Sequence, residues 1–309
     1  MNIKLNWFMS NLNFKVLLPV LLFLVCLSIS YVFIMDIETA LPAISSQPGE
    51  KDELVYFGVI SRYSPRSIVS GYQPLMKYLS ENTPYNFKLK LSRNYLETVD
   101  QLAMGRIDFA SLGNYTYIQA HKKFGVRCIA MPINAEGSIE NYDDIIVATD
   151  SEIRSLVDLK GKSFAFASKQ SFSSWMGIWM LKESGVELSD LSRYENLSYH
   201  DLVAEKVLRG DFDAGMVKAV VAQSYKESGI KVLARSPAIP SVPLVVASHV
   251  DSTKKRVVQN ALLRLKSLIA AGLVDTRGWD TEVANGFRPG HDSLFNFPRQ
   301  LLDELESSN

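Results

Sequence analysis

Short apolar runs alternate with amphipathic stretches along the chain from residue 54 onward. Leu54–Val59 has the length of a buried strand, and Phe87–Leu91 alternates apolar residues with lysines, as a half-exposed strand does. Tyr95–Met104 places its apolar residues at helical spacing and is followed by Gly105, a common helix end. This alternation predicts an α/β protein with mainly parallel sheets.

The same patterns predict the remaining elements. Further strands are expected at Ile107–Leu112, Val126–Ile133, Ile145–Ala148, Phe164–Ala167, Phe212–Val217, Val232–Ala234 and Leu244–Ala247. Further helices are expected at Tyr72–Leu79, around Tyr117, and at Met176–Glu183, His200–Leu208, Thr253–Ala271 and Phe297–Leu305. Ser61–Ser70 is polar and contains Pro65, which predicts a loop.

The N-terminal segment has a different character. Val16–Met35 carries no charged residue over about the length that a membrane-spanning helix needs. Lys4 and Lys15 precede it and Asp36 and Glu38 follow it, so the positive-inside tendency places the body of the protein outside the cytoplasm. A cleavable signal peptide normally has a shorter apolar core. We therefore expect a retained anchor within residues 1–35, with a cleaved signal peptide as the alternative.

Residues 36–53 contain proline, glycine and serine with little periodicity, which predicts a tether.

The overall composition limits the classes of function that the chain can have. The chain has 309 residues, 47% of them hydrophobic, enough for two lobes. Its 33 basic and 33 acidic residues balance, so no nucleic-acid partner is expected and any anion site must be local. Cys26 and Cys128 offer no disulfide framework or zinc motif.

A serine-rich stretch joins one predicted strand to the following helix. Ser168, Ser171, Ser173 and Ser174 lie between an apolar run and a helix start. The free N–H groups and the dipole of a helix N-terminus suit an anionic ligand. From these residues alone, an ordinary N-cap at Ser171 or Ser173 is the alternative interpretation.

Several short stretches, taken in order, carry a family resemblance. They are Tyr72-Gln73-Pro74-Leu75, Asn94-Tyr95, Gly105–Asn114, Ser155–Lys162, Ser171–Ser173, His200-Asp201, Arg209–Gly215 and Ile239–Pro243. Together they resemble the phosphate/phosphite/phosphonate-binding (PhnD-like) receptors of ABC transporters, over about residues 54–297. The resemblance implies a type II periplasmic-binding-protein fold, in which two α/β lobes close on a ligand. Lobe 1 would comprise residues 54–146 and 243–309, lobe 2 residues 147–242, with hinges near 146–149 and 235–243.

The resemblance also implies a ligand-binding set: Tyr95, Tyr117, Ser171, Phe172, Ser173, His200 and Asp213. In such receptors the serines hold an oxyanion, and the two tyrosines donate to it from the cleft wall. Tyr115 is an alternative to Tyr117. His200 and Asp213 would interact with the ligand's protons or amino group. Phe172 departs from the family, which usually has threonine there, and would narrow or cap the pocket.

Other patterns are weaker. Arg62 and Arg66 lie in the first strand–helix loop, where an arginine either clamps a phosphonate or is merely solvated. Gly161-Lys162-Ser163 resembles the end of a P-loop, but Leu156 stands where the first glycine is needed. The four histidines lack zinc-ligand spacing, and no GxSxG motif is present. We expect no enzyme activity, no metal and no cofactor.

These observations predict a receptor on the periplasmic side of the bacterial inner membrane, anchored by residues 16–35. It would capture phosphate, phosphite or a phosphonate and offer it to an ABC permease. The alternative is a membrane-tethered sensor that signals to a partner kinase or cyclase. The retained anchor is the feature that favours this alternative.

Overall fold

The computed structural model describes Leu24 and residues 53–307. Except for Leu24, the predicted anchor at residues 16–35 lies outside the described residues, and so does the predicted tether except for Glu53. Both stay predictions. Among the helices described, none combines the length and the apolar character needed to cross a membrane.

The first sheet is built from both ends of the folded region. Within residues 53–307 it has six strands in the order β13-β4-β12-β3-β1-β2. Their bounds are β1 Leu54–Val59, β2 Asn86–Leu91, β3 Phe109–Ser111, β4 Arg127–Pro132, β12 Leu244–Val246 and β13 Phe287–Pro289. This sheet forms the centre of lobe 1.

The second sheet uses only the middle of the chain. Within the described residues it has five strands in the order β10-β6-β9-β7-β8. Their bounds are β6 Asp143–Ala148, β7 Ser163–Phe166, β8 Arg193–Asn196, β9 Ala214–Lys218 and β10 Ile230–Arg235. This sheet forms the centre of lobe 2.

The two sheets share one strand pattern. β1 is parallel to β2 and β3, and β7 is parallel to β8 and β9. The strand that enters each sheet from the other lobe, β12 or β6, runs antiparallel to its neighbours. The sheets are therefore mixed, and the prediction of mainly parallel sheets is wrong. Strand–helix alternation predicts parallel neighbours, but it carries no information about strands that return from the other lobe.

Two segments, 133–142 and 236–243, connect the sheets. Their central residues pair with each other as the antiparallel strands β5 (Glu140–Asn141) and β11 (Ile239–Pro240). The predicted first hinge, 146–149, falls instead at the end of β6. This strand begins two residues before the predicted Ile145, and Asp143 and Asp144 are both buried within it, where Asp143 lies opposite Lys218 of β9.

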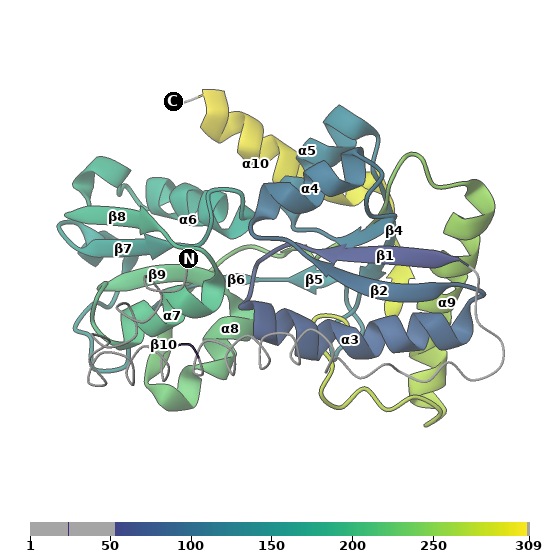
Figure 1. The fold of residues 1–309 in the computed structure, drawn as a ribbon. Coiled ribbons are helices and arrows are strands. Elements are labelled where there is room, and N and C mark those ends of the chain that lie inside the picture. The colour runs from purple at the N-terminus through teal and green to yellow at the C-terminus, as the bar shows by residue number, and fades with distance from the viewer. Residues whose placement is uncertain (1–23, 25–52, 308–309) are drawn as a thin grey trace, which may run out of the picture. The chain divides into compact units, whose positions relative to one another are not determined.

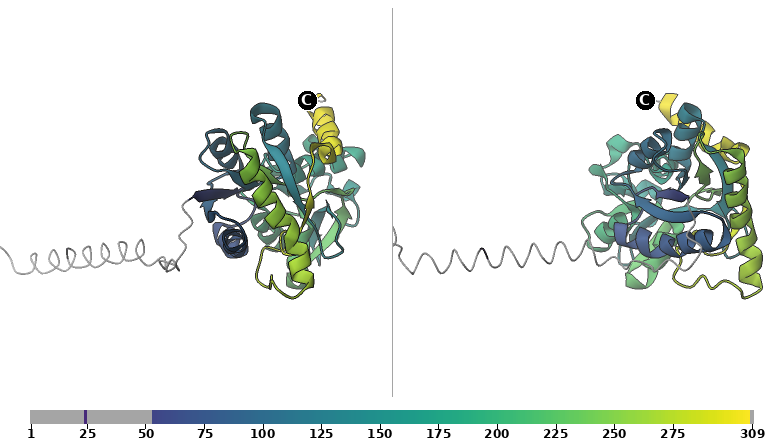
Figure 2. Two further views of the ribbon diagram at one scale, coloured as in Figure 1. Left: turned by 90° about the vertical axis from the view of Figure 1, so that its right-hand side faces the viewer. Right: turned by 45° about the vertical axis from the view of Figure 1, so that its right-hand side comes forward.

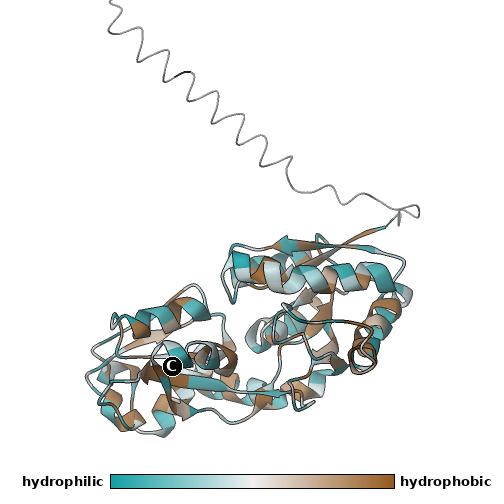
Figure 3. Cartoon of the chain, turned by 90° about the horizontal axis from the view of Figure 1, so that it is seen from below, coloured by the Kyte–Doolittle hydropathy of each residue, from teal (hydrophilic) through white to brown (hydrophobic). Residues whose placement is uncertain are grey.

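Helices cover both faces of each sheet (Figure 1). In lobe 1 they are α3 Pro65–Asn82, α4 Tyr95–Ala103, α5 Asn114–Phe124 and α9 Ser252–Ala270, and in lobe 2 α6 Phe172–Glu183, α7 His200–Leu208 and α8 Ala219–Ser224. The last helix, α10 Asn296–Ser307, contacts both α5 and α6 and so joins the lobes. Figure 2 shows α9 crossing one side of lobe 1. Many helices mix hydrophilic and hydrophobic residues, as helices that cover a sheet with one face do (Figure 3).

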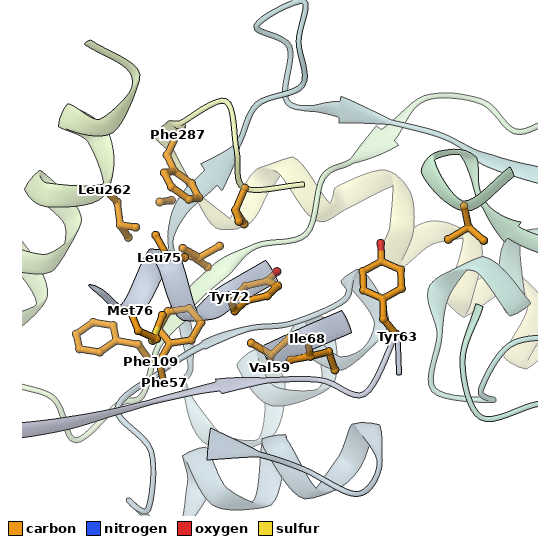
Figure 4. Packing of buried hydrophobic residues seen from close by; sticks show 14 of the residues in the cluster. Phe57, Val59, Tyr63, Ile68, Tyr72, Leu75, Met76, Phe109, Leu262 and Phe287 are labelled. Carbon is orange, nitrogen blue, oxygen red and sulfur yellow. The ribbon is translucent and has the colours of Figure 1, made fainter. Parts of the chain in front are cut away.

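The packing beneath α3 illustrates how the core fixes the site. Phe57 and Val59 of β1 point to the same face of the sheet, where they pack with Tyr72 and Leu75 of α3 and Leu262 of α9 (Figure 4). All five side chains are buried. This packing therefore fixes the end of β1, and with it the start of the following loop, within lobe 1.

Helix α3 begins earlier than predicted. Residues 61–70 were expected to be a loop, but the helix starts at Pro65, and Ser64 caps it by accepting a hydrogen bond from the N–H of Ser67. Proline is well tolerated in the first helical turn because its missing N–H would have no helical partner there. The loop after β1 is consequently short, and Arg62 lies within it.

Candidate functional site

A small cavity lies where strands of both sheets end. In lobe 1, Arg62 follows β1, and Gly113 and Asn114 follow β3; in lobe 2, Ser171 follows β7 and Lys218 ends β9. All of these residues line the cavity. Ligands of open α/β sheets commonly bind at the carboxyl ends of the strands. The fold therefore brings residues from distant segments of the chain together at one cavity between the lobes.

The cavity is small. Its volume is about 30 Å³, which is about two to three times the space that one water molecule needs. Such a cavity suits the head group of a small ligand rather than a nucleotide or a sugar. A larger ligand would require the lobes to separate.

Four helices begin at this cavity. Their first residues, Tyr95 of α4, Asn114 of α5, Phe172 of α6 and His200 of α7, all line it. The dipoles of four N-termini are directed at the cavity, and the positive end of each favours negative charge. The backbone geometry alone therefore favours an anion in this cavity.

Ser171 does not act as an ordinary helix cap. Among the described residues, its hydroxyl makes no capping hydrogen bond to α6, and its Oγ lies 3.3 Å from Nε2 of His200. Ser173 lines the same cavity from the first turn of the helix. The Ser171 hydroxyl thus lies beside His200 at the cavity and does not cap the start of α6.

Arg62 brings a buried positive charge to the cavity. Its side chain is almost fully buried, and its Nη2 donates to the hydroxyls of Tyr72 at 2.6 Å and Ser111 at 2.5 Å. Nη1 is also buried but has no hydrogen-bond partner within residues 53–307. A guanidinium with one edge fixed and the other edge free can bind an oxyanion with little loss of conformational entropy.

A second cation, Lys218, reaches the cavity from lobe 2. Its Nζ lies 2.8 Å from Oε1 of Glu282, and Oε2 of the same carboxylate lies 3.4 Å from Nε of Arg62. The Tyr63 hydroxyl also donates to Glu282, at 2.7 Å. Burial opposes ionisation of Glu282, but Lys218 and Arg62 outweigh it and lower its pKa. Glu282 is therefore an ionised counter-charge held between two cations.

The two lobes contact each other around the cavity. The His200 N–H donates to the carbonyl oxygen of Arg62 at 3.2 Å, which links α7 of lobe 2 to the loop after β1. The rings of Tyr115 in α5 and Trp175 in α6 stack at 5.9 Å and 9°. With the Lys218–Glu282 ion pair, these contacts hold the lobes closed.

Several polar atoms in the cavity lack partners in the described part of the chain. They are the Tyr95 hydroxyl, Oδ1 of Asn114, both carboxylate oxygens of Asp143 and Nδ1 of His200. Burial raises the pKa of Asp143 to about 6, with the positive charge of Lys218 opposing the rise. Burial, helped by Lys218, lowers the pKa of His200 to about 3, so its imidazole is neutral at pH 7. Buried polar atoms without partners are costly, and their concentration here indicates a binding site.

The structure brings together five of the seven residues predicted from the sequence. Tyr95, Ser171, Phe172, Ser173 and His200 line the cavity. The Phe172 side chain is buried at the start of α6. An aromatic ring thus forms part of the wall where the family usually has a hydroxyl.

The other two predicted residues do not line the cavity in the part of the chain that the structure describes. The Tyr117 hydroxyl donates to Asp292 at 2.9 Å, and its ring packs against Phe295. Asp213 accepts hydrogen bonds from the N–H of Ser163 at 2.8 Å and from its hydroxyl at 2.7 Å. These hydrogen bonds outweigh burial and lower the pKa of Asp213. Both residues have structural partners, and we do not carry them into the proposed site.

Three charged groups at the site were not selected from the sequence: Asp143, Lys218 and Glu282. One feature of the sequence could have indicated Lys218, because a lysine that ends an otherwise apolar strand is unusual. Asp143 precedes the strand predicted at Ile145–Ala148, and Glu282 lies in a segment without apolar periodicity. Within residues 53–307, no group of three or more His, Cys, Asp or Glu residues is placed to hold a metal ion.

Comparison with known proteins agrees with this geometry. Residues 57–293 match the family described as "ABC transporter, phosphonate, periplasmic substrate-binding protein". The chain is 22% identical to the phosphonates-binding periplasmic protein of Escherichia coli, over 74% of this chain and 72% of that protein. It is 27% identical to the phosphate-import protein PhnD of Mycolicibacterium smegmatis, over 53% of this chain and 54% of that protein.

A solved structure supports the fold. PhnD1 of Prochlorococcus marinus in complex with methylphosphonate superposes with a TM-score of 0.73 at 18% identity, covering 82% of this chain and 98% of that chain. This similarity confirms the two-lobed fold predicted from the sequence, and the match over residues 57–293 confirms the family resemblance. The chain belongs to the periplasmic substrate-binding protein family of ABC phosphonate transporters.

Proposed function

We propose that this protein binds a small phosphorus oxyanion, namely phosphate, phosphite or a phosphonate, between its two lobes and presents it to an ABC permease. Arg62, Lys218 and the serine hydroxyls hold the anion, and Tyr95 and His200 complete its hydrogen bonds. Closure of the lobes is the conformational change that a permease recognises. The ligand leaves chemically unchanged, which ³¹P NMR of the ligand after incubation tests.

One observation carries this proposal: four helix N-termini and two buried cations face a single small cavity. Each N-terminus favours an anion, and charge-assisted hydrogen bonds in a desolvated site are strong. Methylphosphonate, bound by the similar PhnD1 structure, and phosphate, named for the M. smegmatis relative, both fit this chemistry.

A thermal-shift screen of the full-length protein in a non-ionic detergent tests the ligand class. A ligand at 100 times its dissociation constant should stabilise the native state by about 2.7 kcal/mol, which raises the melting temperature by about 5–10 °C for a domain of this size. We expect this shift with phosphate, phosphite or methylphosphonate and none with chloride or acetate. If all three phosphorus oxyanions leave the melting temperature unchanged, the proposal is wrong.

Single substitutions separate the proposed site from the residues that we leave out of it. Ser173→Ala should weaken methylphosphonate binding by about tenfold or more, because it removes a hydrogen bond to a charged group. Asp213→Ala and Tyr117→Phe should change the dissociation constant by less than about twofold, because residues without shared partners usually act independently. Isothermal titration calorimetry measures all three. A tenfold loss in Asp213→Ala would place the ligand elsewhere.

We further propose that residues 16–35 remain attached and anchor the protein to the inner membrane. The support is the uncharged length of this segment and the change of charge sign across it. The protein should stay with the membrane after alkaline carbonate washing, and peptide mapping should recover residues that precede residue 16. A mature N-terminus beyond residue 35 would show cleavage instead.

A further inference from the structure

We propose that a second pocket between the lobes binds the substituent of the ligand and favours phosphonates whose substituent carries a second anionic group, such as a carboxylate. Arg93 of lobe 1 and Lys169 of lobe 2 supply the positive charge. This inference rests on the proposed function and deepens it, because it names the class of phosphonate that the site accepts.

The second pocket, here called the outer pocket, adjoins the small cavity. It is lined by residues 61 and 93–95 of lobe 1 and by residues 168–170 and 196–198 of lobe 2. It shares Tyr95 with the small cavity, and Gln170 directly precedes Ser171, which lines that cavity. A ligand whose head group occupies the small cavity can therefore extend its substituent past Tyr95 into the outer pocket.

The outer pocket has the room that the small cavity lacks. Its volume is about 330 Å³, against about 30 Å³ for the small cavity. The small cavity offers space for only two or three water molecules, which suffices for a phosphonate head group but not for several further atoms. A substituent longer than a methyl group therefore lies in the outer pocket.

Tyr95 marks the path between the two spaces. Its side chain is 2% exposed, and its hydroxyl has no hydrogen-bond partner in the described part of the chain. Oδ1 of Asn94 accepts a hydrogen bond from the N–H of Glu97 at 3.0 Å and so fixes the start of α4, where Tyr95 lies. A buried hydroxyl without a partner is costly. Its position on the wall of both spaces indicates that a ligand contacts it there.

The charge of the outer pocket is one-sided. Arg93 and Lys169 line it, and its described lining contains no aspartate or glutamate. Lys169 is exposed and has no ion-pair partner within residues 53–307. Nε of Arg93 lies 3.2 Å from Oε2 of Glu97, but the Arg93 side chain is 89% exposed, and such exposed pairs are weak. An anionic substituent therefore meets two cations and no carboxylate.

Hydrogen bonds hold the backbone of Lys169 at the pocket. Its carbonyl oxygen accepts from Nε1 of Trp175 at 3.0 Å, and the carbonyl oxygen of Ser168 accepts from the Ser171 N–H at 2.8 Å. The position of the residue is thus fixed, while its long side chain is free to rotate. A flexible ammonium recognises charge without demanding one geometry of the substituent.

3-Phosphonopropionate and its amide, 3-phosphonopropionamide, are the matched probes, because they differ in charge at one end and little in shape. Calorimetry on the full-length protein in a non-ionic detergent at low salt should show the carboxylate bound about fivefold or more tightly than the amide, as expected for two exposed charge pairs. The cationic 3-aminopropylphosphonate should bind more weakly than the amide, because Arg93 and Lys169 repel it.

Substitution of both cations tests their role. In the double variant Arg93→Gln/Lys169→Gln, the preference for the carboxylate over the amide should fall below about twofold. Lys162→Gln is the matched control, since Lys162 is also exposed but precedes β7, whereas Lys169 follows it. The control should keep the wild-type preference. On the unmodified protein, added salt should reduce the preference, because exposed charges are screened.

Three results would overturn this inference and leave the proposed function intact. They are equal affinity for the carboxylate and the amide, binding of the amine as tight as that of the carboxylate, and an unchanged preference in the double variant. If the wild-type protein binds neither methylphosphonate nor any other phosphorus oxyanion, the proposed function fails and the inference fails with it.

Discussion

Replacing Arg62 by methionine is expected to weaken methylphosphonate binding several hundred-fold. Methionine retains much of the buried length but removes the guanidinium whose free Nη1 is buried at the cavity. Truncating one partner of a buried, hydrogen-bonded charge pair typically costs about 2–5 kcal/mol, and 3–4 kcal/mol corresponds to about 150–850-fold in affinity. Isothermal titration calorimetry of the full-length protein measures the change.

Arg66→Met is the matched control. Arg66 lies four residues further on, in the first turn of α3, where it is exposed and outside the cavity lining. It should bind methylphosphonate as the wild type does. A loss of less than about tenfold in Arg62→Met, or equal losses in the two variants, would remove Arg62 from the site.

Replacing Glu282 by glutamine is expected to destabilise the ligand-free protein by about 3 kcal/mol, because Arg62 and Lys218 lose their buried counter-charge. A bound oxyanion supplies negative charge to the same two cations. The ligand should therefore raise the melting temperature of Glu282→Gln more than that of the wild type. Differential scanning calorimetry with and without methylphosphonate gives both quantities.

The stability difference should depend on pH. The pKa of Glu282 is lowered from 4.5 to about 2, since Lys218 and Arg62 outweigh the effect of burial. A carboxylate with a lowered pKa contributes stability above its unfolded pKa and loses it as the pH falls through the folded pKa. The difference between wild type and Glu282→Gln should thus be complete above pH 4.5 and shrink towards pH 2.

Glu195→Gln serves as the comparison for Glu282→Gln. Glu195 forms an ion pair with Arg193 on the surface of lobe 2, with both side chains about half exposed. Such pairs contribute about 0–1 kcal/mol. A Glu282→Gln variant no less stable than Glu195→Gln would show that Glu282 is not needed as a counter-charge.

The sequence predicted the core strands and helices well because their apolar periodicity is strong. It missed β8 and β13, which lie at sheet edges: all four residues of β8 are exposed, and β13 has one buried residue of three. Edge strands of this kind carry no apolar run. The start of α3 was missed because proline indicates a loop as readily as a first helical turn.

The candidate site was only partly readable from the sequence. Ser171, Ser173 and His200 lie at helix starts, so local pattern and family resemblance both indicated them. Lys218 and Glu282 form an ion pair, but they are 64 positions apart in the sequence, so no local pattern indicates that they interact. Asp213 was selected from a family motif, but its hydrogen bonds to Ser163 hold it at the start of β9. Such pairings depend on tertiary contacts that no local pattern contains.

A crystal structure of the full-length protein with methylphosphonate tests the central claim most directly. A phosphonate oxygen is expected within about 2.7–3.2 Å of Nη1 of Arg62, with further oxygens near the Ser173 hydroxyl and the start of α6. The account is contradicted if the ligand binds outside the cavity between the lobes, or if it binds there without contacting Arg62.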